Sequence, residues 1–244
     1  MTLTKLQIYR DVIWQRYDRN KLDAQFTQTD LWSASHLPSD WRSQIRLGPP
    51  PLGATEAECY ELENLIGLRP EFKDELEAQA DSIAGFYDAF AATVPPIGDP
   101  VINKVVNKVS GEIAQVVFYF KHQYSRARPF QVSNLVPIFA VGNPRHPLHA
   151  SYPSGHASQA GAIAEVLKFL IDPISQDSTA QLRLKIDELA WRIGYSREVA
   201  GLHFRSDTVA GIELARQTFD LLRCSPLIAP MLVDARERMK LLYL

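Results

Sequence analysis

The stretch PVINKVVNKVSGEIAQVVFYFKHQYSRARP, residues 100–129, decides the fold of this chain. Its apolar residues recur at intervals of three and four, the spacing that places side chains on one buried face of an α-helix. That face is made of Ile102, Val105, Val106, Val109, Ile113, Val116, Val117 and Phe120. Asp99-Pro100 marks the start of the helix and Pro129 its end, because proline suits the first helical position and disrupts the interior.

Helical patterns also flank this segment on both sides. Thr55-x-x-Glu58 has the form of a capping box, which predicts a helix from 55 to about 68, and Pro70 predicts another that runs to about 94. Amphipathic or apolar spacing predicts further helices over 4–19, 157–171, 178–197, 207–222 and 230–242. Because no segment shows the two-residue alternation of a strand, the predicted fold class is all-α, a helical bundle.

The remaining segments are predicted to be irregular. Residues 129–153 contain five prolines, and a loop of this length usually carries function. Residues 20–53, with Trp32 and Trp41, would form a lid or part of an interface, and the sequence does not decide between the two. We expect a single helical domain over residues 1–244.

Composition and charge exclude several classes of protein. The chain has 244 residues, with 26 Lys and Arg against 28 Asp and Glu, and this balance argues against nucleic acid or an anionic membrane as a partner. No run approaches the roughly 18 apolar residues of a membrane helix, and residues 1–20 lack the apolar centre of a secretory signal. Cys59 and Cys224 provide neither a disulfide framework nor zinc-ligand spacing. We therefore expect a cytoplasmic protein; its amphipathic ends would close its own core or form a homo-oligomer.

Cations stand where the helical pattern calls for apolar residues. Lys121 follows Val117 by four positions, and Arg128 lies two turns further along the same face. Arg197 extends the stripe of its own helix, four positions after Ile193. Burial of a cation is costly without a compensating anion, either a carboxylate or a ligand. The alternative for each one alone is a helix end from which the long side chain reaches solvent.

The tetrapeptide Pro153-Ser154-Gly155-His156 directly precedes a predicted helix. Ser154 can cap that helix, and the free N–H groups of Gly155 and His156 would point at whatever lies there. A helix start of this kind binds oxyanions through its unpaired donors and its dipole. The alternative is an ordinary serine cap with no ligand.

His203 and Asp207 are four positions apart, so the carboxylate can orient the imidazole through one ring nitrogen and leave the other free. This arrangement suits a nucleophile or a ligand of a metal centre, and the alternative is a structural hydrogen bond. Other polar residues are expected elsewhere. Arg126 should lie off the cationic face, His122 should be peripheral, and His36 should lie on the surface.

The charged and histidine positions form three motifs in chain order: Lys121-x6-Arg128-Pro129, Pro153-Ser154-Gly155-His156 and Ser196-Arg197-x5-His203-x3-Asp207. Their order and internal spacing resemble the signature of the superfamily that joins type 2 phosphatidic acid phosphatases, bacterial class A acid phosphatases and vanadium-dependent haloperoxidases. The resemblance covers about residues 100–222. It implies the helical-bundle fold of that superfamily, with the active site at its centre.

The resemblance also implies a role for each motif residue. Lys121, Arg128 and Arg197 would hold the equatorial oxygens of a phosphate or a vanadate, and Ser154 and the Gly155 N–H would complete this cradle. His203 would be the axial group that attacks phosphorus or coordinates vanadium. His156 would be the acid–base residue, and Asp207 would orient His203. One cradle serves both reactions because trigonal-bipyramidal vanadate resembles the transition state of phosphoryl transfer.

The surroundings of the motifs look more like the haloperoxidase branch. The run His149-Ala-Ser-Tyr-Pro-Ser-Gly-His-Ala157 is similar to that branch, and His149 matches a second histidine of bromoperoxidases. The alternative is that His149 is only a loop residue, like His146. Two departures are Phe118, where haloperoxidases often have Trp, and a chain that is short for that family.

The sequence therefore predicts a vanadium-dependent haloperoxidase of the bromoperoxidase type. Its cofactor would be vanadate, and its substrates would be hydrogen peroxide, a halide and a small organic acceptor. The first alternative is a metal-independent phosphomonoesterase that acts through a phosphohistidine at His203. A further alternative is a non-catalytic anion-binding protein, although such a protein has no need for both His156 and His203.

Overall fold

The computed structural model describes residues 34–79, 84–139, 149–172 and 176–243. Within these ranges the chain forms helices and irregular segments and no strand, so the all-α prediction is confirmed. The elements are α3 (Trp41–Gln44), η1 (Leu52–Ala54), α4 (Thr55–Asn64), η2 (Ile66–Leu68), α5 (Arg69–Ala78), α6 (Ala84–Ala91), η3 (Pro95–Gly98), α7 (Pro100–Tyr124), α8 (Pro129–Val132), α9 (Gly155–Ile171), α10 (Gln176–Val199), α11 (Arg205–Leu222) and α12 (Ile228–Tyr243). The predicted helix over residues 4–19 lies outside the described residues, as does His146.

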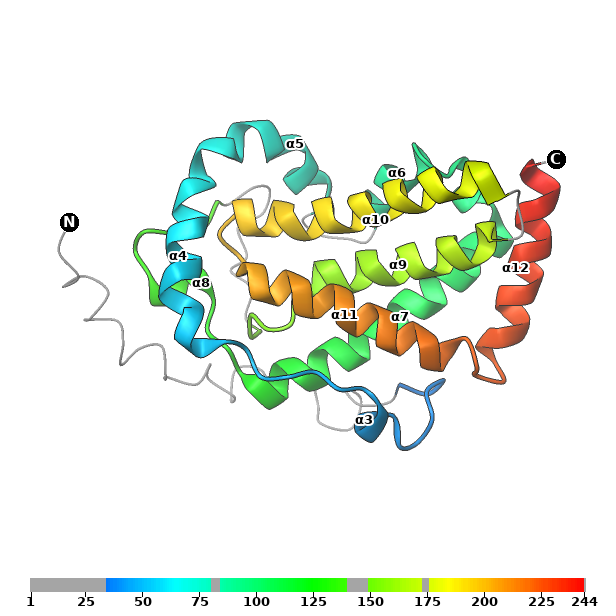
Figure 1. The fold of residues 1–244 in the computed structure, drawn as a ribbon, viewed down its shortest axis with the longest axis horizontal. Helices are drawn as coiled ribbons and strands as arrows, with labels where there is room; N and C mark the ends of the chain where they lie inside the picture. The colour runs from blue at the N-terminus through cyan, green and yellow to red at the C-terminus, as the bar shows by residue number, and fades with distance from the viewer. Residues whose placement is uncertain (1–33, 80–83, 140–148, 173–175, 244) are drawn as a thin grey trace.

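Helix α9 is the centre of the bundle. It packs against α7, α10 and α11 along its length, and α12 crosses the far end (Figure 1). Its sequence explains this position, because small residues allow the neighbouring helices to approach closely. A Cβ atom at Gly161 would stand 2.8 Å from the Cβ of Ala215 on α11. The large apolar side chains of α9, such as Leu167 and Leu170, are fully buried.

Helix α7 contributes the apolar face that its sequence predicts, but it ends earlier than predicted. Asp99 caps its start by accepting a hydrogen bond of 2.9 Å from the Val101 N–H. Ser125 adopts a left-handed conformation with φ of 47° and donates its N–H to the Lys121 carbonyl, which ends the helix at Tyr124. Pro129 therefore does not terminate this helix; it begins the short helix α8 instead.

The described part of the N-terminal region, from residue 34 onward, packs against the bundle. Trp41 is buried and packs edge-on against Tyr119 of α7, with ring centroids 5.1 Å apart. Helices α4 and α5 then cover the end of the bundle at which α10 finishes and α11 begins (Figure 1). Trp41 thus belongs to the core, while Trp32 lies outside the described residues.

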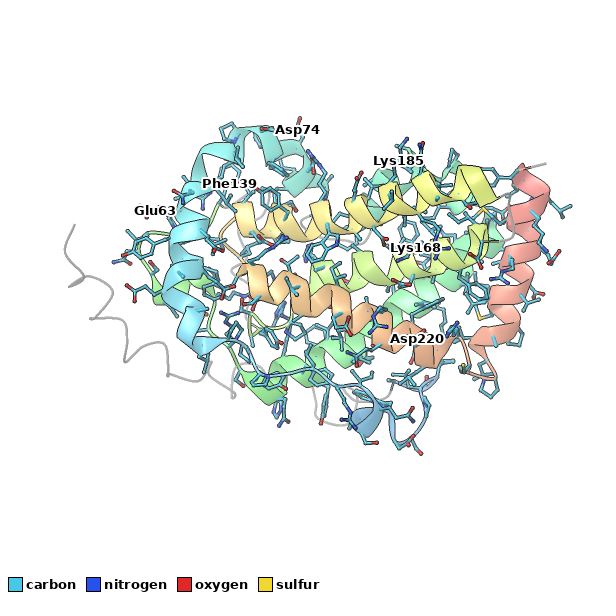
Figure 2. The ribbon with its side chains drawn as sticks, viewed as in Figure 1. Glu63, Asp74, Phe139, Lys168, Lys185 and Asp220 are labelled. Carbon is cyan, nitrogen blue, oxygen red and sulfur yellow. The ribbon has the colours of Figure 1, made fainter. Side chains whose placement is uncertain are left out.

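The outer and inner sides of this cover are distinct. Figure 2 shows Glu63 and Asp74 pointing away from the bundle, whereas Phe139 lies between α5 and α10. Phe139 packs against the apolar cluster that includes Phe72 of α5 and Val199 of α10. Arg69 joins the two layers, because its guanidinium donates to the Val199 carbonyl at 3.0 Å.

Two predictions about the N-terminal helices were wrong. The capping box is absent, because α4 has Ala54 at its N-cap and the Glu58 side chain bonds to other elements. The helix predicted from residue 70 to about 94 is divided into α5 and α6. Gly85 explains how the two helices meet, since a Cβ there would stand 2.1 Å from the Ala78 carbonyl oxygen.

Candidate functional site

All three sequence motifs meet at one end of the bundle. The end of α7, the start of α9, the end of α10 and the start of α11 lie together there (Figure 1). Lys121, Arg128, Arg197 and His203 are buried, whereas His149, Gly155 and His156 keep partial exposure. The fold therefore creates a buried polar site, and its partly exposed residues lie on the loop before α9 and on the first turn of that helix.

Lys121 lies on the last turn of α7 and is almost fully buried. Its ammonium group donates hydrogen bonds to the carbonyl oxygens of Ala150 at 2.6 Å and Ser151 at 3.0 Å. Burial and the neighbouring charge of Arg128 hold its pKa well below the ordinary value. The lysine thus fixes the loop before α9 and places a cation inside the protein.

Arg128 connects three parts of the site. Its guanidinium donates to the carbonyl oxygens of His149 at 3.1 Å and Leu202 at 2.8 Å. It also lies 3.0 Å from Nδ1 of His149 and 3.4 Å from Nε2 of His203. Extended backbone at Arg128, after the end of α7, directs this side chain into the site. Its position is therefore set by the chain reversal rather than by the helical face expected from the sequence.

Arg197 is a buried cation on the last turn of α10. Its Nε is buried and has no hydrogen-bond partner within the described part of the chain. Burial and the charge of Arg128 lower its pKa to about 10. A buried donor without an acceptor is unusual in a native structure, and this nitrogen is available to donate to a ligand; Nε of Arg126 is also buried without a partner in the described part of the chain.

Ser154 caps α9 and is fully buried. Its hydroxyl accepts a hydrogen bond of 3.4 Å from the Ala157 N–H, and its own N–H donates to the Asp207 carbonyl at 2.9 Å. Gly155 and His156 occupy the first two positions of the helix, where N–H groups have no intrahelical acceptor. The predicted cap is present, and it orients this helix start toward α11.

His203 and Asp207 contact each other as their spacing predicts. His203 Nδ1 lies 3.2 Å from Asp207 Oδ2, and the same oxygen accepts from the Ser151 hydroxyl at 2.5 Å and from the Phe204 N–H at 3.0 Å. His203 precedes α11 rather than lying on it. Burial and the charge of Arg128 lower the pKa of His203 to about 3, so its imidazole is neutral near pH 7. With Nδ1 donating to Asp207, Nε2 is left with its lone pair.

His156 lies beside the site, and its Nε2 contacts the backbone at the end of α5. This nitrogen lies 3.0 Å from the Gln79 carbonyl oxygen, and the imidazole packs against the ring of Phe86, with centroids 5.3 Å apart. Burial and the charge of Arg197 hold its pKa well below the ordinary value. Gln79 was not identified from the sequence, because a single glutamine at the end of a helix carries no distinctive pattern.

His149 belongs to the site rather than to a detached loop. Its ring lies against Arg128, and it contacts Phe118 edge-on with centroids 5.6 Å apart. Burial and the charges of Lys121 and Arg128 hold its pKa well below the ordinary value. The contacts with Arg128 and Phe118 are the feature that would distinguish it from a loop residue.

Arg126 and Glu58 are site residues that sequence reasoning missed. Arg126 was expected off the cationic face, but its guanidinium is buried and binds Asp207 Oδ1 at 2.6 Å and Glu58 Oε2 at 2.8 Å. The expectation failed because Ser125 turns the chain before this residue. His36 was also placed wrongly on the surface; it is half-buried and its Nδ1 lies 2.6 Å from Glu112.

The charges around His203 do not balance. Four buried cations (Lys121, Arg126, Arg128 and Arg197) lie near three buried carboxylates (Asp207, Glu58 and Glu198), and burial raises the pKa of Glu198 to about 7. Buried charge without a partner is strongly unfavourable, so the excess of positive charge fits an anionic ligand. Among the described residues no cluster of three or more His, Cys, Asp and Glu could hold a metal cation. The imidazole of His203 surrounded by cations suits a tetrahedral oxyanion.

A cavity of about 390 Å³ adjoins the site. It is lined by residues of α5, α6 and α10 and by Gln79, which follows α5. The apolar residues of this lining are Ala78, Ala89, Leu189 and Ile193, together with Gly85. Asp74, Asp88 and the ion pair of Glu75 with Arg192 also line it. Gln79 belongs to both regions, because its backbone carbonyl contacts His156. Gln79 therefore separates the cavity from the imidazole of His156.

Known proteins match this chain over different lengths. A vanadium-dependent bromoperoxidase of Ascophyllum nodosum is 35% identical over 106 residues, which cover 34% of this chain and 18% of that protein. The chain thus spans less than a fifth of that relative. Non-specific acid phosphatases of Providencia stuartii and Salmonella typhimurium are 28% and 24% identical, and the alignments cover 78% and 88% of both partners.

A solved structure, a transmembrane PAP2 type phosphatidylglycerolphosphate phosphatase from Bacillus subtilis, aligns with 91% of this chain and 95% of its own, at a TM-score of 0.41 and 17% identity. In the described part of this chain, no helix has the length and apolar character needed to cross a bilayer. Residues 105–219 match the PAP2 superfamily, and this range holds the three motifs that the fold brings together. Over that range, which is 115 of the 244 residues, the chain is similar to the PAP2 superfamily.

Proposed function

We propose that this protein is a vanadium-dependent haloperoxidase that uses hydrogen peroxide to oxidise a halide, bromide in the first instance, to hypohalous acid. The observation that carries the proposal is His149, whose Nδ1 lies 3.0 Å from an Arg128 nitrogen. This places a second imidazole beside the cradle, as the resemblance to bromoperoxidases implies. The 35% identity to the Ascophyllum nodosum bromoperoxidase supports the same branch.

The residues present fit vanadate. The unpartnered Nε of Arg197 and the excess buried positive charge both call for an oxyanion. Lys121, Arg128 and Arg197 would bind its oxygens, Ser154 and the Gly155 N–H would complete the cradle, and His203 Nε2 would be its protein ligand. When bound, vanadate supplies a Lewis-acid centre that activates peroxide toward halide.

The protein residues have separate tasks in this reaction. The three cations withdraw negative charge from the oxygens that they bind, which makes a bound oxygen more electrophilic. His149 or His156 accepts the proton of the incoming peroxide, since both imidazoles are held neutral by burial. Asp207 keeps the proton of His203 on Nδ1, so Nε2, which lies 3.4 Å from an Arg128 nitrogen, keeps the lone pair that would bind the anion.

The cavity next to His156 is the place we assign to the organic acceptor. Its apolar residues Ala89, Leu189 and Ile193 would contact a small organic molecule, and charged residues of α5, α6 and α10 complete the lining. Filling it with Ala89→Leu should raise the KM for the acceptor and leave vanadate affinity unchanged.

A paired assay on one preparation tests the proposal. One arm follows bromination of a dione by peroxide and bromide, and the other follows hydrolysis of an aryl phosphate, each with and without orthovanadate. Bromination that requires vanadate, with weak hydrolysis, supports the haloperoxidase. The proposal fails if vanadate-loaded protein shows no peroxide-dependent bromination.

Two variants locate the chemistry. His203→Ala should abolish vanadate binding, because it removes the only imidazole aligned by Asp207 among the described residues. His149→Ala should change the rate or the halide preference and retain vanadate. His122→Ala, a partly exposed histidine on the last turn of α7, is the matched control and should change neither.

The second candidate is a phosphomonoesterase, favoured by the acid phosphatases that align with 78% and 88% of this chain. His203 Nε2 would attack phosphorus, the ester P–O bond would break, and the leaving oxygen would take a proton from Nδ1 of His156 in its doubly protonated form. Water would then hydrolyse the phosphohistidine. Vigorous hydrolysis that vanadate inhibits, with no bromination, would establish this activity. Tight phosphate binding without either reaction would identify an anion-binding protein.

A further inference from the structure

A second layer of charged residues lies behind His203 and Asp207. Arg126 Nη1 donates to Asp207 Oδ1 at 2.6 Å and to the Ser206 hydroxyl at 2.7 Å, and its Nη2 donates to Glu58 Oε2 at 2.8 Å. The guanidinium also lies over the Phe204 ring, 3.9 Å from its centroid. Arg126 thus bridges two carboxylates that come from opposite ends of the sequence.

Glu58 in turn binds the start of the helix that carries Asp207. Its Oε1 accepts from the Ser206 N–H at 2.7 Å, and its Oε2 accepts from the Ser206 hydroxyl at 3.0 Å. A carboxylate at this position is favoured by the free N–H groups and the dipole of α11. Glu58 therefore fixes both the guanidinium of Arg126 and the first turn of α11.

The two oxygens of Asp207 have different partners as a result. Oδ1 accepts from Arg126, and Oδ2 faces His203 and Ser151. Without a partner on Oδ1 the carboxylate could rotate about its side-chain bond and present either oxygen to the imidazole. Burial alone would raise the pKa of Asp207, but the Arg126 charge holds it below the ordinary value and keeps the group ionised.

We propose that Glu58 and Arg126 are a positioning pair for the site: they orient Asp207 so that His203 presents Nε2, with its lone pair, to a bound oxyanion. The proposal rests on the proposed function only in that the oxyanion binds at His203. It applies equally to vanadate and to phosphate. The pair also ties the cover formed by α4 to the reacting histidine, since Glu58 lies on that helix.

Affinity and tautomer measurements test the pair without requiring either reaction. Dissociation constants for orthovanadate and for inorganic phosphate are measured by calorimetry, and nitrogen NMR reports which ring nitrogen of His203 carries the proton. Arg126→Gln should lower the affinity for both anions by about 10- to 100-fold, the usual cost of losing a residue that orients a ligand. It should also change His203 from a single Nδ1–H tautomer to a mixture. Arg126→Lys, which keeps the charge but cannot bridge both carboxylates, should be intermediate.

Glu58→Gln is the second variant and serves if Arg126→Gln does not fold. It should lower the affinity for both anions about tenfold or less, because the remaining amide oxygen still accepts hydrogen bonds from Arg126 and Ser206. The double variant should lose little more affinity than Arg126→Gln alone, since the two residues act through one chain of contacts. Matched controls are Glu63→Gln, exposed on the same helix, and Arg238→Gln, whose ion pair with Asp99 joins α12 to the start of α7.

The results separate this inference from the proposed function. Absence of bromination in the wild type would overturn the haloperoxidase and leave the positioning pair to be judged on affinity and tautomer. Folded variants of Glu58 and Arg126 that bind both anions within twofold of the wild type, with His203 still in one tautomer, would overturn the pair. Equal losses in the Glu63 and Arg238 controls would also overturn it.

Discussion

The backbone oxygen of Gln79 lies 3.0 Å from Nε2 of His156, and the side-chain oxygen of the same residue accepts a hydrogen bond of 2.9 Å from Ser196. A carbonyl oxygen only accepts, so Nε2 of His156 carries the proton and Nδ1 has the lone pair. His203 has the opposite arrangement, because Asp207 accepts from its Nδ1. The two histidines of the site are therefore held in opposite tautomers by their hydrogen-bond partners.

Nitrogen NMR at pH 7 should detect this difference directly. We expect His156 to be neutral with the proton on Nε2, and His203 to be neutral with the proton on Nδ1, because burial lowers the pKa of both rings. His36, paired with Glu112 in the middle of α7, provides an internal reference. Observation of the same tautomer for both site histidines would contradict the assignment and would remove the proposed Nε2 ligand of the anion.

Much of this site follows from sequence patterns because each motif lies at a helix end. The apolar stripe of α7 places Lys121 inside, and the run Pro153 to His156 precedes a helix of small residues that can only be central. Once those helices pack, their ends converge. The positions of Lys121, Ser154 and Asp207 thus depend on local spacing and on burial, both of which can be read from a sequence.

The parts that could not be predicted depend on single backbone conformations and on distant partners. The left-handed Ser125 shifts Arg126 from the outer face to the interior, and serine carries no strong preference for that conformation. Glu58 matches a capping-box pattern, yet its carboxylate binds Arg126 and the N–H of Ser206 at the start of α11 instead. Ser206 lies 148 positions away in the sequence. A local pattern cannot reveal a competing tertiary partner of this kind.

Gly211 should be intolerant of any side chain. A Cβ there would stand 2.7 Å from the Ser154 carbonyl oxygen and 3.0 Å from the Cβ of Ala157, and backbone cannot move aside cheaply. Gly211→Ala should therefore lower the free energy of unfolding by about 1–3 kcal/mol, the usual cost of overpacking. It should also weaken phosphate binding, since it displaces the start of α9.

Gly111 provides the matched control, because it lies inside α7 and a Cβ added there would meet no neighbouring side chain within 4 Å in the described part of the chain. Gly111→Ala should be neutral or stabilise the protein by about 0.5–1 kcal/mol through helix propensity. Urea unfolding and calorimetric titration with phosphate measure both effects. Equal stability changes in the two variants would contradict the close approach of α9 and α11.

Replacement of Arg197 should affect stability and binding in opposite directions. In the absence of an anion its buried, unpartnered Nε and its neighbour Arg128 make the cation a net cost to folding. Arg197→Met should therefore raise the free energy of unfolding in phosphate-free buffer by about 1 kcal/mol or more. The same variant should lose at least about tenfold in affinity for phosphate or vanadate, because an ionic donor is removed.

Urea unfolding with and without saturating phosphate separates the two effects. Phosphate should stabilise the wild type through linkage and should stabilise Arg197→Met much less. Arg183→Met is the control, since its pair with Asp172 is exposed and should contribute within about 0.5 kcal/mol under both conditions. A loss of stability in phosphate-free Arg197→Met would show that this arginine is satisfied without an anion.

Glu198 should make the protein less stable as the pH rises through neutrality. The side chain is buried next to Arg197, and its contact with Arg205 is long, at 3.4 Å. Burial raises its pKa to about 7, and the Thr208 hydroxyl and the Arg205 charge offset only part of this increase. Because the folded form holds the proton more tightly than the unfolded form, its contribution is fully present below about pH 4.5 and is lost as the pH rises through about 7.

Glu198→Gln mimics the protonated carboxyl and should remove this loss. The free energy of unfolding of the variant minus that of the wild type should be larger at pH 8 than at pH 5. The two differences should themselves differ by at most about 3 kcal/mol. Urea unfolding at both pH values measures it, with Glu63→Gln, exposed on α4, as the control that should show no such difference (Figure 2). The histidines of the site act in the opposite direction, since their lowered pKa values cost stability as the pH falls below about 6.5. A stability difference that is equal at pH 5 and pH 8 would mean that Glu198 remains ionised in the folded protein, with a stronger partner than Arg205.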